Sequence, residues 1–155
     1  MSNIAVFAGS FSPFTKGHED IVSKALPLFD KIFIAIGHNY NKKDAFSVEQ
    51  RMKWIQDLYA DNPKVEVLTY EGLTVDLCRK VGATHLVRGV RNTADFQMEQ
   101  EMCLINRQLS PEVETILILA SPQWAAVSSS LVRELWQLGA DYSPYVSYKL
   151  PELKP

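Results

Sequence analysis

The sequence predicts an α/β fold in which one parallel sheet of five strands carries helices on both faces. Short apolar runs rich in β-branched residues alternate with segments of helical periodicity along the chain. Most of these runs are apolar throughout, which is typical of strands buried on both faces. A strict alternation of strand and helix favours right-handed crossovers between parallel strands.

Five strands are expected, at residues 4–8, 32–37, 65–70, 85–87 and 115–120. Capping signals mark the helices between them: Ser47 with Gln50 three residues later, Asn92 as an N-cap, and Gly82 after a helix end. The side chains expected on the apolar helix faces are Ile21, Val22, Ala25, Leu28 and Phe29; Val48, Met52, Ile55 and Tyr59; Leu73, Leu77 and Val81; Ala94, Met98, Met102, Ile105 and Leu109; and Leu131, Leu135 and Leu138.

The length and composition indicate a single domain over residues 1–155, with a short proline-rich tail at 142–155 made of turns or partly mobile. Hydrophobic residues make up 46% and the net charge is -2, which argues against a general nucleic-acid binder. Cys78 and Cys103 have no metal-ligand spacing and indicate buried thiols in a reducing cytosol. The sequence shows neither a signal peptide nor an apolar stretch of roughly 20 residues, so we expect a cytoplasmic protein without a membrane segment.

The loop between the first strand and the first helix, residues 9–18, is the first candidate for phosphate binding. Backbone N–H groups and the helix dipole favour an anion at such a junction. The loop has neither the GxxxxGK[ST] pattern nor GxGxxG, so neither common nucleotide motif applies. An ordinary turn with a surface histidine at His18 remains an alternative for this loop taken alone.

Three further loops favour the phosphate interpretation. Arg88 and Arg91 flank Gly89 beyond the expected end of the fourth strand, and an arginine fork matches phosphate oxygens. Residues 124–130 place three serines at the start of a helix, although one of them acting only as an N-cap is the alternative. Lys42 and Lys43 follow the second strand. Because every loop follows a strand's carboxyl end, all four are expected at one edge of the sheet.

These residues together resemble a known family. Gly9-Ser10-Phe11-x-Pro13-x-Thr15-x-Gly17-His18 is similar to the TxGH form of the nucleotidylyltransferase signature. Residues 87–91, together with Asp95-Phe96, Glu99 and Asn106-Arg107, resemble phosphopantetheine adenylyltransferase of the bacterial type. The serines 128–130 match that family's terminal serine motif, and the resemblance covers about residues 3–140. Related transferases usually carry HxGH, so Thr15 favours phosphopantetheine as the acceptor.

The resemblance implies a Rossmann-like fold of the nucleotidylyltransferase type and a reaction of coenzyme A biosynthesis. AMP passes from ATP to 4′-phosphopantetheine, giving dephospho-coenzyme A and pyrophosphate. Mg²⁺ carried by the ATP phosphates, a homohexamer, and dephospho-coenzyme A or coenzyme A as product or inhibitor are implied as well, with no protein metal ligands. Two alternatives remain: another transferase of the superfamily, acting on a mononucleotide or using CTP, and a non-catalytic nucleotide or coenzyme A sensor.

The resemblance also implies roles for individual residues. His18 and Lys42 are the catalytic residues, with His18 on the α-phosphate and Lys42 between that phosphate and the acceptor. Ser10, Lys42, Thr74 and Arg88 form the acceptor site. The implied ATP site consists of Ser10, Phe11, His18, Gly89, Val90, Arg91, Glu99, Trp124, Ala125, Ala126, Val127, Ser128, Ser129 and Ser130. Ser12 departs from the pattern, because the family usually has an aspartate there.

Overall fold

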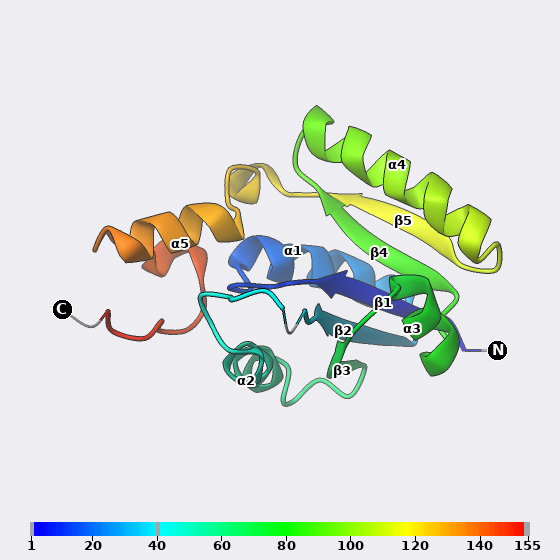
Figure 1. Cartoon of the computed structure of the whole chain (residues 1–155), viewed down its shortest axis with the longest axis horizontal. Helices are drawn as coiled ribbons and strands as arrows, with labels where there is room; N and C mark the ends of the chain where they lie inside the picture. The colour runs from blue at the N-terminus through cyan, green and yellow to red at the C-terminus, as the bar shows by residue number, and fades with distance from the viewer. Residues whose placement is uncertain (1, 40, 154–155) are drawn as a thin grey trace.

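The protein was analysed as a computed structural model that describes residues 2–39 and 41–153. Its centre is a parallel five-stranded sheet of order β3-β2-β1-β4-β5, which confirms the predicted fold class (Figure 1). The strands are β1 (Ile4–Gly9), β2 (Lys31–Gly37), β3 (Val65–Tyr70), β4 (His85–Val90) and β5 (Glu114–Leu119).

Helices connect each strand to the next, as a parallel sheet requires. They are α1 (Lys16–Ala25), α2 (Val48–Leu58), α3 (Thr74–Val81), α4 (Thr93–Leu109) and α5 (Ser129–Gln137). The predicted caps are present: Ser47 and Asn92 accept N–H bonds from Gln50 and Asp95, and Gly82 has the left-handed φ of 75°. The α5 helix lies beyond the carboxyl ends of the strands (Figure 1).

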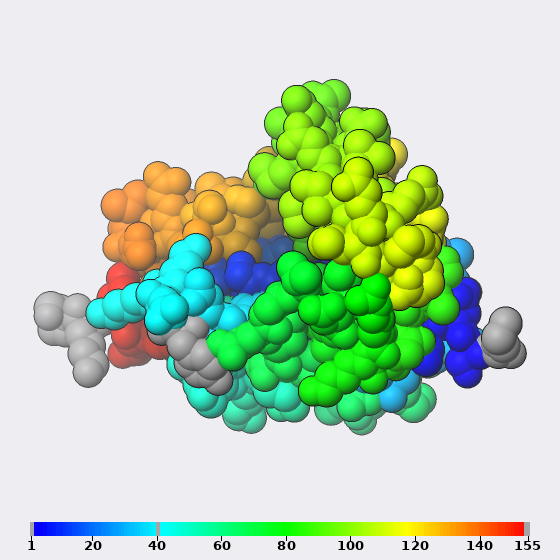
Figure 2. Space-filling view, turned by 45° about the vertical axis from the view of Figure 1, so that its right-hand side comes forward, coloured from blue at the N-terminus to red at the C-terminus, as the bar shows by residue number. Residues whose placement is uncertain are grey.

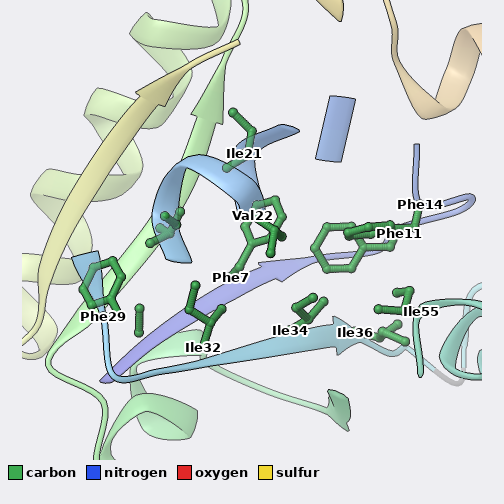
Figure 3. Close-up of a cluster of buried hydrophobic side chains, with 13 residues drawn as sticks. Phe7, Phe11, Phe14, Ile21, Val22, Phe29, Ile32, Ile34, Ile36 and Ile55 are labelled. Atoms are coloured by element: carbon green, nitrogen blue, oxygen red, sulfur yellow. The ribbon is translucent and has the colours of Figure 1, made fainter. Parts of the chain in front are cut away.

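The two faces of the sheet bury two separate apolar clusters, because side chains alternate along each strand. Phe7 of β1 packs with Val22 and Ile55 under α1 and α2 (Figure 3). Val6 and Ala8 point the other way and pack with residues of α3. The near-continuous apolar runs of the sequence are therefore strands covered on both sides.

The β4 strand is longer than the sequence predicted. Expected to end at residue 87, it continues to Val90, so Arg88, Gly89 and Val90 are strand residues and only Arg91 follows the end. The cause is unequal pairing: β1 pairs with β4 only as far as Val87, whereas β5 pairs with it up to Val90. The last three residues of β4 are thus paired with β5 but not with β1.

Part of the predicted apolar helix faces lies on the surface. Leu28, Leu73 and Leu138 are all more than half exposed, and Val132 is the buried residue of α5 instead. Helix α4 exposes most of its predicted face, including Met98, Met102, Ile105 and Leu109. Periodicity identified the helices correctly, but it does not show which end of a helix extends past the core.

The tail after α5 packs against the rest of the molecule. It contains a short 3-10 turn at Ser143–Tyr145, and both Val146 and Leu150 are buried beside Phe46. The Tyr148 hydroxyl donates a hydrogen bond to the Phe14 carbonyl, which ties the tail to loop 9–18. Within the described ranges, 2–39 and 41–153, no helix combines the length and apolarity that crossing a membrane requires.

Candidate active site

Two neighbouring cavities lie at the carboxyl ends of the strands. The first, of about 300 Å³, is lined by loop 9–18, the end of β4 and the start of α5, and it contains His18, Arg88 and Arg91. The second, of about 780 Å³, contains Lys42, and Ser10 lines both cavities. Figure 2 shows this edge hollowed between α5 (orange), the cyan segment before α2, and the green α3, with the blue N-terminal segment at its bottom.

Loop 9–18 is held by aromatic side chains that turn back into the core. The Phe11 ring lies over Gly9 so closely that a Cβ there would be 2.9 Å from Phe11 Cε1. Phe11 itself has a φ of 47°, a left-handed conformation that non-glycine residues rarely adopt and that often occurs at functional loops. Phe11 and Phe14 are both buried (Figure 3). Only the backbone of Phe11 can therefore face a ligand in the cavity.

The spacing of Thr15 and His18 forms a capping box at the start of α1. The Thr15 side chain accepts the His18 N–H, and His18 Nδ1 accepts the Thr15 N–H at 2.8 Å. A ring nitrogen that accepts a backbone N–H carries no proton of its own. In the neutral imidazole the proton is therefore on Nε2, which is left as the single ring donor.

The environment of His18 keeps the imidazole neutral. The Phe14 ring stacks on it with centroids 5.1 Å apart, and the Phe11 ring meets it edge-on at 5.0 Å. Burial, together with the positive charges of Arg88 and Arg91, lowers the pKa of His18 from the ordinary 6.5 to about 3. His18 can thus donate a hydrogen bond to an anion at neutral pH, but it is not a cation there.

Arg88 is anchored from both sides. Its Nε and Nη2 each donate to a Glu99 carboxylate oxygen at 2.8 Å, and its Nη1 donates to the Ala8 carbonyl. Such a bidentate pair fixes the guanidinium plane. Glu99 on α4 is buried and Arg88 is partly exposed. Three of five N–H donors are used, so two remain for a ligand.

Arg91 is anchored in a similar way at the end of β4. Its Nε lies 3.0 Å from Asp95 Oδ2 on α4, and its Nη1 donates to the Val127 carbonyl at 3.5 Å. Beside it, Gly89 leaves room for α1, because a Cβ at this position would lie 2.9 Å from Ile21 Cγ1. The close approach of α1 to β4 is what brings His18 and Arg91 to one cavity.

The start of α5 offers backbone groups rather than hydroxyls. Ser128 is the N-cap and its side chain accepts the Leu131 N–H, which is the N-cap alternative noted above for one serine. The Ser129 hydroxyl donates to the Pro13 carbonyl at 2.7 Å, and the Ser130 hydroxyl accepts from Arg133. The N–H groups of Ser129 and Ser130 come before any carbonyl of the helix that they could bond, and they point at its N-terminus, where an anion is favoured.

Comparisons with known proteins show which family the chain belongs to. The Cytidylyltransferase-like family profile matches residues 6–135. A phosphopantetheine adenylyltransferase of Flavobacterium psychrophilum is 49% identical over 142 residues, covering 92% of this chain and 93% of the relative. That of Porphyromonas gingivalis is 49% identical over 144 residues, covering 93% and 94%. The chain belongs to the phosphopantetheine adenylyltransferase family.

Solved structures of lower identity share the fold. The bifunctional NMN adenylyltransferase/ADP ribose pyrophosphatase of Francisella tularensis is similar with a TM-score of 0.74 at 22% identity, covering 97% of this chain and 46% of that one. The nicotinic acid mononucleotide adenylyltransferase of Plasmodium falciparum gives 0.67 at 17% identity, covering 95% and 91%. The predicted Rossmann-like architecture of the nucleotidylyltransferase type is thereby confirmed.

Most of the residues that the family resemblance assigns line one of three cavities. The first cavity brings together Ser10, Phe11, His18, Arg88, Gly89, Val90, Arg91, Glu99, Trp124, Val127, Ser128 and Ser129. Lys42 is exposed and lines the second cavity. Thr74 begins α3, where its hydroxyl lies 2.9 Å from Tyr70 Oη, and lines a third cavity of about 240 Å³ with Ser10 and Arg88. Ala125, Ala126 and Ser130 adjoin the first cavity in sequence without lining it.

Two of the histidines are placed differently from His18. His38 follows β2 and lines the second cavity. His85 begins β4 at the opposite edge of the sheet, where its Nδ1 lies 2.8 Å from Thr84 Oγ1.

Sequence reasoning missed two arginines at the site. Arg133 of α5 lines the second cavity, and its Nη1 donates to the Ser12 carbonyl at 2.6 Å. Arg51 of α2 is buried and donates to the Ser10 carbonyl, also at 2.6 Å. Their positions inside amphipathic helices gave no local signal, because an arginine on a helix is usually solvated. Arg133 lies three residues after Ser130, on the same helix face.

Proposed function

We propose that the protein is a pantetheine-phosphate adenylyltransferase, which transfers AMP from ATP to 4′-phosphopantetheine and forms dephospho-coenzyme A and pyrophosphate. The observation that carries this function is the neutral His18, held by a capping box in a cavity with Arg88, Arg91 and the N-terminus of α5. The family supplies the identity of the acceptor.

The reaction requires no nucleophile from the protein. An ionised oxygen of the acceptor phosphate attacks the α-phosphorus of ATP in line, the new P–O bond forms, and the bond to the β-phosphate oxygen breaks to release pyrophosphate. The enzyme has to align the two substrates and stabilise the charge of the transition state. His18 does so by donating its Nε2–H to an α-phosphate oxygen, where a preorganised donor is most effective.

The surrounding cations divide between the substrates. Arg91 and the free N–H groups at the start of α5 face the polyphosphate, and Arg88 directs its two unused donors towards the acceptor phosphate. Lys42 approaches from the second cavity, where Ser10 marks the junction. Because Glu99 and Asp95 hold the arginines through paired hydrogen bonds, the guanidinium groups are oriented before substrate arrives.

We propose that Mg²⁺ is carried by the ATP phosphates and not by a protein cage. Glu99 and Asp95, the carboxylates of the first cavity, are engaged by Arg88 and Arg91. No cluster of three or more metal-ligating side chains occurs in the part of the chain that the structure describes. Carried on the phosphates, the ion would supply positive charge to the leaving pyrophosphate, and the residues of this chain would bind the remaining phosphate oxygens.

A pyrophosphate-release assay tests the function. With ATP, Mg²⁺ and 4′-phosphopantetheine we expect turnover, which CTP in place of ATP does not support and which excess EDTA abolishes. Nicotinate mononucleotide as acceptor should give no signal, and added dephospho-coenzyme A should inhibit as the product. Turnover with the mononucleotide but not with phosphopantetheine would assign the chain to another transferase of the superfamily, and nucleotide binding without turnover would favour a sensor.

We further propose that the protein is a homo-oligomer, a hexamer as the family resemblance implies, that buries α4. Four apolar side chains at helical spacing, Met98, Met102, Ile105 and Leu109, are each about half exposed or more on this helix. An apolar stripe of this kind is typical of a protein interface. Met102→Glu is expected to shift the mass in solution towards the monomer, whereas Gln108→Glu on the same helix should not. A monomeric unaltered chain in analytical ultracentrifugation would contradict the proposal.

We also place the protein in the cytoplasm. Cys78 and Cys103 are both free thiols, which is the usual state in a reducing compartment. Cell fractionation with an antibody against the chain is the direct measurement, and recovery in the membrane or secreted fraction would contradict this location.

A further inference from the structure

Among the described residues, the segment that carries Lys42 lies largely on the surface and is anchored at both of its ends. It joins β2 to α2, and residues 41–45 are all exposed. At its beginning, the His38 N–H donates to the Tyr70 carbonyl at 2.9 Å. At its end, Phe46 is buried. A contact between these two ends has to hold Lys42 in place if its ammonium is to bind a phosphate at a defined position.

Asp44 provides a link from the middle of this segment to loop 9–18. One of its carboxylate oxygens accepts a hydrogen bond from the Ser12 hydroxyl, and the other lies 3.6 Å from Arg51 Nη1. The same Arg51 donates to the Ser10 and Phe46 carbonyls. The carboxylate of Asp44 thus joins the segment, loop 9–18 and a buried cation, two residues after Lys42.

The negative charge of Asp44 accounts for a serine at position 12. An aspartate there would place a second carboxylate in contact with Asp44, and like charges in contact repel. A serine supplies a hydroxyl donor to the carboxylate instead. Burial raises the pKa of Asp44, but the Ser12 hydrogen bond and the Arg51 charge outweigh it and leave the pKa below its usual value. Asp44 is therefore ionised at neutral pH.

We propose that the hydrogen bond between Asp44 and Ser12 is the positioning contact for Lys42. This inference rests on the proposed function, because it concerns how Lys42 is held for the transfer. The proton stays on the Ser12 hydroxyl, and neither residue is required to touch substrate.

An exchange of the two side chains tests the link. Ser12→Asp should lower kcat/KM by at least about tenfold, since it sets two carboxylates against each other. Ser12→Asp with Asp44→Ser restores one hydroxyl and one carboxylate and should recover to within about threefold of the unaltered chain. A double variant no better than Ser12→Asp would overturn the proposal. Ser12→Ala, which removes the donor without adding charge, covers the case in which Ser12→Asp does not fold.

A second cycle asks whether Asp44 acts through Lys42. Asp44→Ala should lower kcat/KM about tenfold in the unaltered chain but less than about twofold in a Lys42→Ala background. Without the lysine there is no ammonium left for the Asp44 contact to position. Equal losses in both backgrounds would overturn the proposal. Asp61→Ala removes an exposed carboxylate after α2 and should change neither value. If the unaltered chain releases no pyrophosphate, the proposed function is contradicted. If the unaltered chain is active but the effects of Asp44→Ala and Lys42→Ala are additive, only the positioning role is contradicted.

Discussion

Replacement of His18 by alanine is expected to lower kcat about 10²–10³-fold, the usual effect of losing one donor to a transition-state oxygen. The KM for each substrate should change far less, because the donor acts on charge that develops during transfer. Steady-state pyrophosphate release measures both constants. Near-normal turnover of a folded His18→Ala protein would contradict the assignment.

The capping role of His18 needs a separate control. Alanine removes the acceptor for the Thr15 N–H as well as the imidazole, so a loss of stability could be mistaken for a catalytic effect. His18→Gln retains an acceptor at the third helical position, where glutamine is common in capping boxes. We expect its melting temperature to match that of the unaltered chain while its kcat remains at least about tenfold lower.

The low pKa of His18 also has a consequence for pH. Because its pKa is about 3, His18 is neutral throughout the range in which the enzyme is assayed, and kcat should show no step near the ordinary value of 6.5. The pKa is lowered in the folded state, so the contribution of His18 to stability is complete above 6.5 and is lost as the pH falls towards 3. A kcat profile that rises below 6.5 would indicate a cationic His18.

Replacement of Arg88 by alanine is expected to have the second largest effect, on binding and on stability. It removes the cation assigned to the acceptor phosphate and leaves the buried Glu99 carboxylate without its partner. A single deletion from a fully buried pair costs about 3–5 kcal/mol; here the cost should be smaller, because 36% of the Arg88 side chain is exposed. Urea unfolding and the KM for phosphopantetheine measure the two effects.

The double variant Arg88→Ala/Glu99→Gln separates the effect on binding from the effect on stability. Removing the unpaired charge should restore most of the stability, while the KM for phosphopantetheine should stay as high as in Arg88→Ala. Recovery of both values together would show that Arg88 has only a structural role. Glu99→Gln alone should be folded but should raise the same KM, since the arginine loses its bidentate partner.

Much of the site was predictable because loops at the carboxyl ends of parallel strands converge. The spacing of Thr15, Gly17 and His18 marked the first turn of α1, and Asn92 correctly marked the start of α4. The end of β4 was not predictable, because pairing with β5 extends it past Val87. Nor could local patterns reveal Arg51 or Arg133, which acquire their positions only when α2 and α5 pack against loop 9–18.

For loop 9–18, the sequence by itself determined the order of the surrounding elements, the parallel sheet, and the position of His18 on the first turn of α1, since these follow from patterns of residues close together in the chain. Only the tertiary structure decided that His18 is neutral, because its pKa depends on rings and arginines that folding brings around it. The same holds for Ser12, because its side chain bonds to Asp44, which lies 32 residues away in the sequence. Periodicity and caps are local, whereas charge and burial are properties of the packed molecule.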